Sequence, residues 1–321
     1  MSEAGYLFRL NAELGKRLGR LKKRTVGDGI PDLGKQSEYL ASLQLACGGF
    51  PDREGEPDLY YTAFGLRGMA LLGVLDLERA TRAGQWLAGH LNSQATVVDL
   101  HALVESSLLV SLAGAPDPLS TASPDWQARL ADLLQTFRTN DGGYGKVPWA
   151  ASGSTYHSFL VALTHPLMGR KVPDVPSLLS FLSGRERADG GWVEAPAMRK
   201  SGANPTAAAL GLRQMLDSPL EPGRLEQTAV FLDSLAGTDG GYRANSSIPL
   251  SDTLSSFTVA WSLDQHGLAE RIRTTALARY LEMVALPSGG FRAGVWDAGD
   301  DVEYTFYGLG LLALVHGTEG T

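Results

Sequence analysis

Four carboxylates occupy equivalent points in an internally repetitive chain, each at or near the start of an apolar segment with helical spacing. They are Asp58, Asp252, Asp301 and Glu303. Asp300 precedes the last two, so these three acids are close enough in sequence to affect one another's ionisation. A carboxyl group that burial and a charged neighbour keep protonated can donate a proton at neutral pH. A structural interpretation also stands, because aspartate is a favoured N-cap and Asp300 and Asp301 directly precede the last helical segment.

Residues with ring side chains gather in the same parts of the chain as these acids. They are Tyr60, Tyr61, Trp149, Tyr156, His157, Trp296, Tyr304 and Tyr307. A ring face near a cation contributes roughly 0.5 to 2 kcal/mol, and each aromatic ring also buries a large apolar surface. Walls of this kind suit an apolar chain or a cationic intermediate. The same tyrosines are equally consistent with packing at loop edges, with a hydrogen bond at the hydroxyl.

The elements that must position these residues repeat along the chain. A Gly-Gly-aromatic triplet begins at Gly48, Gly142, Gly190, Gly240 and Gly289, and a leucine stands eight residues before each of these glycines. The same rule finds a further copy without glycines, in which a leucine precedes Ala95 by eight residues. The six marker leucines are Leu40, Leu87, Leu134, Leu182, Leu232 and Leu281, which lie 47 to 50 residues apart. The sequence therefore contains six repeats of about 48 residues, and such periods are typical of stacked helical units.

Each repeat predicts two helices joined through a glycine turn, and no strands. The apolar runs at 61–66 and 304–309 follow a polar stretch, and more amphipathic helices are expected at 77–91 and 268–284. Glycine supplies the positive φ and the close backbone approach that such turns need. An open array of repeats needs polar terminal caps, yet the last inner helix, 305–315, is as apolar as the central ones. We therefore expect an all-α fold, a closed α/α toroid of six inner and six outer helices, over residues 31–321.

Residues 1–30 differ from the repeats and predict a separate basic amphipathic helix between residues 6 and 26. Leu10, Leu14, Leu18 and Leu21 have helical spacing. The basic residues are Lys16, Arg17, Arg20, Lys22, Lys23 and Arg24. Three roles fit this pattern: contact with an anionic membrane surface, docking on an acidic partner, or cover for the outer ring.

Composition restricts the class of protein. The 321 residues are 44% hydrophobic and 20% charged, with a net charge of −7, so disorder and general nucleic-acid binding are not expected. Cys47 is the only cysteine, which excludes an intrachain disulfide and a cysteine-built zinc site. No apolar run is long enough to cross a bilayer, and no signal-peptide segment is apparent, so a cytoplasmic location is expected, with peripheral membrane contact through residues 6–26.

The repeated pattern of aromatic-Leu, seven residues, Gly-Gly-aromatic, a polar loop and then Ser or Thr resembles the prenyltransferase and squalene-cyclase repeat. The likeness covers residues 36 to 316 approximately. Its single-toroid length is similar to that of a protein prenyltransferase β subunit of the geranylgeranyltransferase type. The resemblance implies an α/α toroid that binds an isoprenoid chain in a central cavity. It also implies a helical-repeat α subunit as a partner.

The resemblance implies a zinc site that these residues do not complete. Protein prenyltransferases hold zinc with Asp, Cys and His, and the matching positions here are Asp252, Leu254 and Tyr304. A catalytic zinc needs three protein ligands, so no zinc or other cofactor is predicted. The family's diphosphate-binding cations are also missing at 246–250 and at residue 202. Arg243, Arg292 and the pair Arg199 and Lys200 are the substitute candidates, with solvated loop charges as the alternative. Mg²⁺ is expected only with a diphosphate substrate.

The class II cyclases of the same superfamily protonate their substrate with the middle acid of Asp-x-Asp-Asp-Thr. Residues 301–305 match this motif with Glu303 at the donor position and Asp301 as the first acid. Three functions remain open: a prenyltransferase-like protein, a small class II terpenoid cyclase, and a non-catalytic toroid that binds a lipid or a protein. The candidate catalytic residues are Asp252, Asp301 and Glu303. His101 and Glu105 lie one helical turn apart, but they lack a third metal ligand at a fixed spacing.

Overall fold

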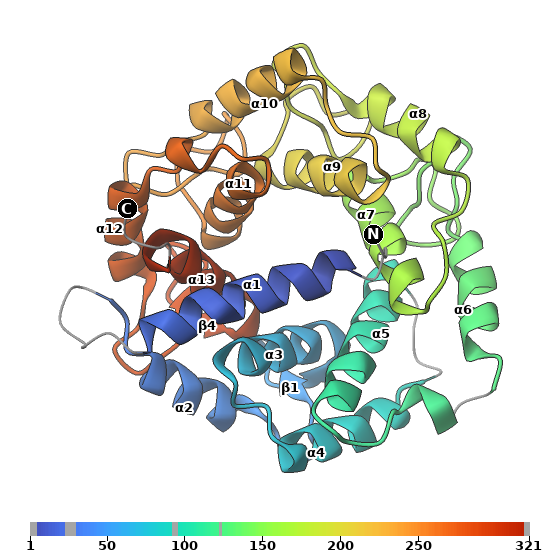
Figure 1. Ribbon diagram of the computed structural model, residues 1–321, viewed down its shortest axis with the longest axis vertical. Helices are drawn as coiled ribbons and strands as arrows, with labels where there is room; N and C mark the ends of the chain where they lie inside the picture. The colour runs from blue at the N-terminus through green and yellow to red at the C-terminus, as the bar shows by residue number, and fades with distance from the viewer. Residues whose placement is uncertain (1–4, 23–29, 92–95, 122–123, 318–321) are drawn as a thin grey trace.

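The chain forms two concentric rings of helices (Figure 1). This computed structural model describes residues 5–22, 30–91, 96–121 and 124–317. Within them, the inner ring consists of α3 (Leu59–Leu72), α5 (Val97–Leu112), α7 (Thr155–Leu167), α9 (Ala203–Met215), α11 (Thr253–Gln265) and α13 (Val302–His316). The outer ring consists of α2 (Leu33–Leu43), α4 (Leu77–Ala88), α6 (Trp126–Gln135), α8 (Val175–Arg185), α10 (Pro222–Ser234) and α12 (Thr274–Val284). Two short 3₁₀ helices, η1 (Leu119–Thr121) and η2 (Ala269–Arg271), lie in the connections.

The inner ring closes on itself. Each inner helix contacts the next one in the chain, and α13 returns to contact α3. All six marker leucines are buried, because each outer helix turns its marker towards the inner ring. The predicted closed α/α toroid is therefore confirmed.

The glycine pairs allow neighbouring repeats to approach closely. Gly240 has a φ of +97°, and a Cβ there would meet the carbonyl oxygen of Ala276 at 2.5 Å. The second glycine of each pair packs against the aromatic residue next to a marker leucine of the following repeat. At the seam of the ring, Gly290 of the last repeat packs in this way against Tyr39 of the first.

The aromatic residue after each glycine pair is fully buried and hydrogen-bonded to the inner helix. The Trp192 N–H donates to Thr206 Oγ1 at 2.9 Å, and the Tyr242 N–H donates to Ser256 Oγ at 2.9 Å. The recurring Ser or Thr of the sequence pattern is thus the acceptor for this buried backbone donor. Leaving such a donor unpaired would be unfavourable, which explains the fixed spacing.

The expectation that the chain has no strands is wrong in detail. Two antiparallel pairs of two-residue strands are present, β1 (Phe50–Pro51) with β2 (Pro57–Asp58) and β3 (Phe291–Arg292) with β4 (Asp300–Asp301). The loop after the glycine pair folds back so that the residue before the inner helix pairs with the buried aromatic residue. This hairpin fixes where the inner helix begins, and segments so short leave no alternating pattern in the sequence.

The N-terminal helix α1 (Gly5–Leu21) crosses one end of the inner ring (Figure 1). Its leucines Leu10, Leu14 and Leu18 are buried, and the helix contacts α3 and α13. Arg17 pairs with Asp264 in the last turn of α11, at 2.9 Å between Nη2 and Oδ2. The expectation that this helix covers the outer ring is therefore wrong, because its apolar face packs on the inner ring. Peripheral membrane contact and docking on an acidic partner through residues 6–26 stay predictions.

Two of the predicted basic residues, Lys23 and Arg24, lie outside the described residues. Among the described helices, none combines the length and the apolar character needed to span a bilayer.

Candidate functional site

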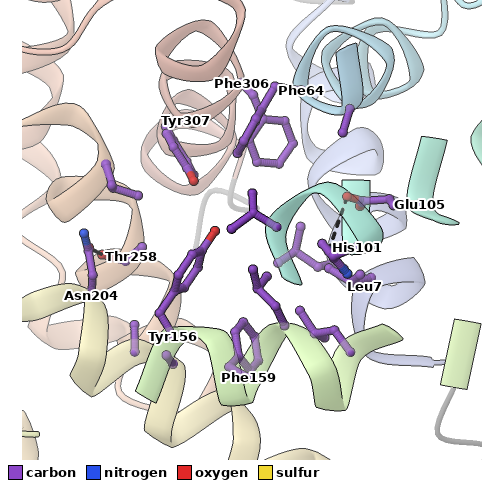
Figure 2. Close-up of a pocket in the computed structure, with 18 of the residues that line it drawn as sticks. Leu7, Phe64, His101, Glu105, Tyr156, Phe159, Asn204, Thr258, Phe306 and Tyr307 are labelled. Carbon is purple, nitrogen blue, oxygen red and sulfur yellow. Dashed lines mark hydrogen bonds and ion pairs between the residues drawn. The ribbon is translucent and has the colours of Figure 1, made fainter. Parts of the chain in front are cut away.

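A cavity of about 440 Å³ lies between the inner helices and α1. Every inner helix contributes to its wall, and most of the lining is apolar. Figure 2 shows the side chains that point into it, among them Phe64, Phe159 and Phe306. The aromatic residues of the lining are Tyr6, Tyr60, Phe64, Tyr156, Phe159, Phe257, Trp261, Phe306 and Tyr307. Apolar pockets with a few polar groups are the usual form of small-molecule sites.

The two ends of the central cavity differ. Leu7 and Leu10 of α1 line it, so α1 forms its floor. The Trp261 Nε1–H donates to the Tyr6 hydroxyl at 3.3 Å, which ties this floor to α11. The first turns of the inner helices, with Tyr60 and Tyr156, lie at the opposite end, where the polar loops join the helices.

A second cavity of about 320 Å³ lies at this loop end and shares Asn204 and Leu254 with the central cavity. Its lining includes Asp252 and Tyr304, so the three positions that match the family's zinc ligands do lie around one space. Asp252 is the N-cap of α11, and its two oxygens accept from the Ser255 N–H at 2.6 Å and the Ser255 hydroxyl at 2.8 Å.

These residues do not fit a catalytic zinc ion. Leucine has no donor atom, and a carboxylate with a tyrosine hydroxyl does not replace the usual cysteine and histidine. No group of three or more His, Cys, Asp or Glu side chains within the described ranges is arranged to hold a metal ion. Ile248, Pro249, Leu250 and Trp296 complete the lining, so the space is mainly apolar.

Glu303 lies in the first turn of α13 and is held by Tyr60. The Tyr60 hydroxyl donates to Glu303 Oε1 at 2.6 Å. Burial raises the pKa of the Glu303 carboxyl to about 7, and the Asp301 charge also raises it, against the opposing effects of Tyr60 and Arg53. Glu303 is therefore partly protonated at neutral pH, as a general acid requires. Burial also raises the pKa of Tyr60 above its usual value.

Two more tyrosines that line the central cavity lie within electrostatic reach of Glu303. The pKa of Tyr156 and that of Tyr307 are both raised, mainly by burial and next by the Glu303 charge. Figure 2 shows both hydroxyl groups pointing towards the same part of the cavity. The structure thus brings the predicted residues Tyr60, Tyr156, Glu303 and Tyr307 together.

The other predicted acids cap inner helices. Asp301 Oδ1 accepts from the Tyr304 N–H at 2.8 Å, and Asp58 accepts from the Tyr61 N–H at 3.0 Å. Asp301 Oδ2 also accepts from Arg53 Nε at 2.8 Å. These contacts are those of the structural interpretation, in which aspartate stabilises the start of a helix.

Several predicted binding residues lie away from both cavities. Trp149 is 81% exposed on its loop. His157 Nδ1 lies 2.6 Å from Ser154 Oγ, and burial lowers the pKa of its imidazole to about 4. Arg243 donates to the carbonyl oxygen of Ser234 at 2.9 Å and so satisfies the end of α10. Arg292 is half-buried and lines neither cavity.

The remaining predicted aromatic residues lie near the loop end. Tyr61 packs edge-to-face against Tyr60, with ring centroids 5.6 Å apart. Burial raises the pKa of the Tyr61 hydroxyl to about 12. Trp296 lines the second cavity and donates from Nε1 to the carbonyl oxygen of Ser251 at 3.2 Å.

Sequence reasoning missed Arg67 of α3 and assigned no site role to His101 and Glu105 of α5, although all three line the central cavity. A signal was present, because each stands inside an otherwise apolar helical segment. Charged residues are almost never fully buried unless they are paired. The nearby Phe159 and Phe257 were also missed, because an inner helix is apolar all round and its pattern does not show which face lines a cavity.

Residues 26–85 and 206–320 match the family described as the prenyltransferase alpha-alpha toroid domain. The chain belongs to this family. No curated protein matches it significantly in sequence. The match includes both ends of the toroid, and therefore both sides of the seam between Gly290 and Tyr39.

Solved structures support the fold of this prenyltransferase-family toroid. Protein geranylgeranyltransferase-I of Candida albicans, complexed with GGPP, aligns with a TM-score of 0.68 at 16% identity, over 88% of this chain and 90% of that chain. The type II terpene cyclase MstE of Scytonema, in a variant complexed with geranylgeranyl dihydroxybenzoate, aligns with a TM-score of 0.58 at 14% identity, over 97% of this chain and 99% of that chain. An alpha-1,6-mannanase of Salegentibacter aligns with a TM-score of 0.59 at 12% identity, over 88% of this chain and 97% of that chain. At such identities the likeness concerns the fold alone.

Proposed function

We propose that this protein binds an isoprenoid chain in its central cavity. The aromatic-lined space of about 440 Å³ supports the proposal. This volume falls in the range of roughly 300 to 1,000 Å³ that small-molecule sites occupy. Two proteins of similar fold, the geranylgeranyltransferase and the terpene cyclase, are complexed with geranylgeranyl compounds.

Zinc-dependent prenylation of a protein is not part of this proposal. That reaction relies on a metal-bound thiolate, because a free thiol with a pKa near 8.5 is only a few per cent ionised at pH 7. The positions of Leu254 and Tyr304 supply no suitable ligand. The helical-repeat partner that the family resemblance implies stays a separate prediction, and the binding proposed here concerns the cavity of the single chain.

Direct binding measurements test the proposal. Calorimetric titration with C15 and C20 isoprenoids should give saturable binding to the wild-type protein. Ala208 lines the cavity, so Ala208→Phe should reduce the affinity at least tenfold by filling the space. The exposed Ala12 of α1 provides the control, and Ala12→Phe should bind as the wild type does. Equal binding by both variants would place the ligand elsewhere.

Proton-initiated cyclisation is a second candidate function, favoured by the raised pKa of Glu303 and by its hydrogen bond to Tyr60. Tyr60 lines the central cavity, whereas Glu303 lies behind it and outside the cavity lining. In this reaction the Glu303 O–H bond breaks, and its proton adds to one carbon of an alkene. The other carbon becomes a cation. The next alkene attacks this cation, which closes a ring and moves the positive charge to a new carbon. Loss of a proton from the final cation completes a terpenoid product of unchanged formula. The faces of Tyr60, Tyr156 and Tyr307 provide electron density for the cation.

Product analysis after incubation with C15 and C20 isoprenoids and with squalene tests this second candidate. Glu303→Gln keeps the shape of the side chain but cannot donate the proton, so cyclised products should disappear while binding remains. Glu194→Gln is the matched control, because Glu194 is a further glutamate at the loop end and lines the cavity. If the wild-type protein binds these compounds but forms no product, the cyclisation candidate is contradicted and the isoprenoid-binding proposal stands.

A further inference from the structure

Three polar side chains form a cluster on the wall of the central cavity, separate from Glu303. Arg67, His101 and Glu105 all line the cavity, and their side chains are 11%, 10% and 6% exposed. Arg67 follows Tyr60 by seven residues on α3, which places the two about 10 Å apart along the helix axis. Figure 2 shows His101 and Glu105 across the cavity from Asn204 and Thr258.

The cluster leaves hydrogen-bonding capacity unused. Arg67 Nε lies 3.2 Å from Glu105 Oε1, but neither atom has a hydrogen-bond partner of suitable geometry among the described residues. The Arg67 guanidinium lies over the Phe306 ring, 3.9 Å from its centroid. In the described part of the chain, no acceptor takes a hydrogen bond from its terminal nitrogens. Buried groups of this kind normally find partners.

The hydrogen bonds of Thr164 determine the tautomer of His101. The Thr164 hydroxyl donates its proton to the carbonyl oxygen of Leu160 at 2.7 Å, so its oxygen accepts from His101 Nδ1 at 3.0 Å. Burial lowers the pKa of His101, so the ring is neutral and Nε2 carries a lone pair. Nε2 lies 3.6 Å from Glu105 Oε2. Two acceptors therefore face each other with no donor between them.

The charges of the cluster indicate which ligand group suits it. Arg67 and Glu105 compensate each other, so an added anion or cation would be a buried charge without a counterion. A neutral hydroxyl avoids this problem. It donates to His101 Nε2 or Glu105 Oε2, and its oxygen accepts from an N–H of Arg67.

We propose that this cluster binds the hydroxyl group of an isoprenoid alcohol whose hydrocarbon chain extends from Arg67 towards Tyr60. This inference rests on the proposed isoprenoid binding and adds a substrate class to it. With the hydroxyl bound at the cluster, the part of the hydrocarbon chain about 10 Å further along would lie level with Tyr60 and Glu303.

A series of C15 ligands that differ in one group tests the proposal. Farnesol donates and accepts, farnesyl methyl ether only accepts, and farnesene does neither. Calorimetry at a fixed concentration of nonionic detergent should show that wild-type protein binds farnesol about tenfold more tightly than the other two, as expected for a hydrogen bond to a charged group.

Two variants locate the preference. Arg67→Met with Glu105→Leu removes both charges together, which is better tolerated than removing one. Only the His101 acceptor of the cluster is left in this variant, so the preference for farnesol should be strongly reduced. His101→Phe, with one acceptor removed, should reduce the preference for farnesol. Thr258→Val is the control across the cavity and should retain it.

The outcomes separate the two proposals. Binding of all three ligands with equal affinity by the wild type, or a preference for farnesol that is undiminished in the double variant, would overturn the hydroxyl site and leave the cavity proposal intact. If none of the three ligands binds, the cavity proposal itself fails.

Discussion

The role of each acidic side chain depends on its position relative to the start of a helix. Asp58, Asp252 and Asp301 are the N-caps of α3, α11 and α13, and their carboxylates accept backbone N–H groups. Glu303 lies two residues inside α13, where the backbone N–H groups are not directed at its side chain. Its carboxyl therefore reaches Tyr60 instead. The structural acid Asp301 and the candidate proton donor Glu303 are therefore only two positions apart in the chain.

The raised pKa of Glu303 predicts a pH dependence of stability. The folded chain holds this proton up to about pH 7, whereas the usual carboxyl value is 4.5. Between these values the folded state binds more protons than the unfolded state, so the free energy of unfolding falls as pH rises. Relative to Glu303→Gln, the wild type should lose at most about 3 kcal/mol across this window. Chemical denaturation of both proteins at a series of pH values measures it.

An exposed carboxyl provides the comparison for this measurement. Glu282 of α12 is exposed to solvent in the folded chain. The difference in unfolding free energy between Glu282→Gln and the wild type should therefore stay constant from pH 4.5 to 7. A constant difference for Glu303→Gln as well would mean that Glu303 is ionised normally, and the proton-donor proposal would lose its support.

At the scale of elements, α1 shows what a leucine stripe can and cannot predict. The spacing of Leu10, Leu14 and Leu18 predicts a helix with one buried face, and the structure buries all three. The leucine spacing does not identify the surface against which this face packs. That surface consists of the ends of α3 and α13, far away in sequence, so no local pattern identifies it.

The role of α1 as the cavity floor predicts a change in ligand length. Leu10 lines the cavity, whereas Leu18 is fully buried outside it. Leu10→Ala should deepen the site and shift the binding preference from C15 towards C20 isoprenoids. Both Leu10→Ala and Leu18→Ala should lower the free energy of unfolding by about 2 to 5 kcal/mol, as is usual for buried leucines. Titration of each variant with both chain lengths measures the shift.

In that comparison, Leu18→Ala distinguishes an effect of the cavity floor on binding from an effect of lower stability. It disturbs the packing of the same helix without enlarging the cavity, so its preference between C15 and C20 should match the wild type. The same shift in both variants would show that α1 acts only through stability.

At the scale of the whole molecule, repeats were easier to predict than the site. Gly240 and Leu232 have fixed places because one turn geometry recurs, and the period therefore predicted six repeats. The apolar last inner helix, 305–315, predicted that these repeats close into a ring. The strands β1 and β3 are too short to leave a pattern. The cavity-lining face of Phe257 or Phe306 was not predictable either, because a helix buried on all sides has no polar stripe to orient it.

Closure of the ring also determines how much a substitution in each repeat lowers the free energy of unfolding. Gly190 lies within the chain of repeats, and Gly289 lies at the seam. A Cβ at Gly190 would meet the carbonyl oxygen of Gln227 at 2.6 Å, and one at Gly289 would meet that of Lys35 at 2.6 Å. Both glycines have a φ near +95°, at +90° and +100°. At Gly289 the Cβ would also meet the Cβ of Tyr39 at 2.6 Å, so the local strain there is at least as large as at Gly190.

In an open array, terminal repeats contribute less to the whole, because each repeat depends only on its neighbours. In a closed ring, the first and last repeats are neighbours. Gly190→Ala and Gly289→Ala should therefore each lower the free energy of unfolding by about 2 to 4 kcal/mol in a single transition, of which the strained φ accounts for about 1 to 3. Gly223→Ala, in the first turn of α10 with open space around it, should stay within about 1 kcal/mol of the wild type. Denaturant titrations that give a smaller loss at Gly289, or a separate early transition there, would show that the seam is weaker than the other contacts of the ring.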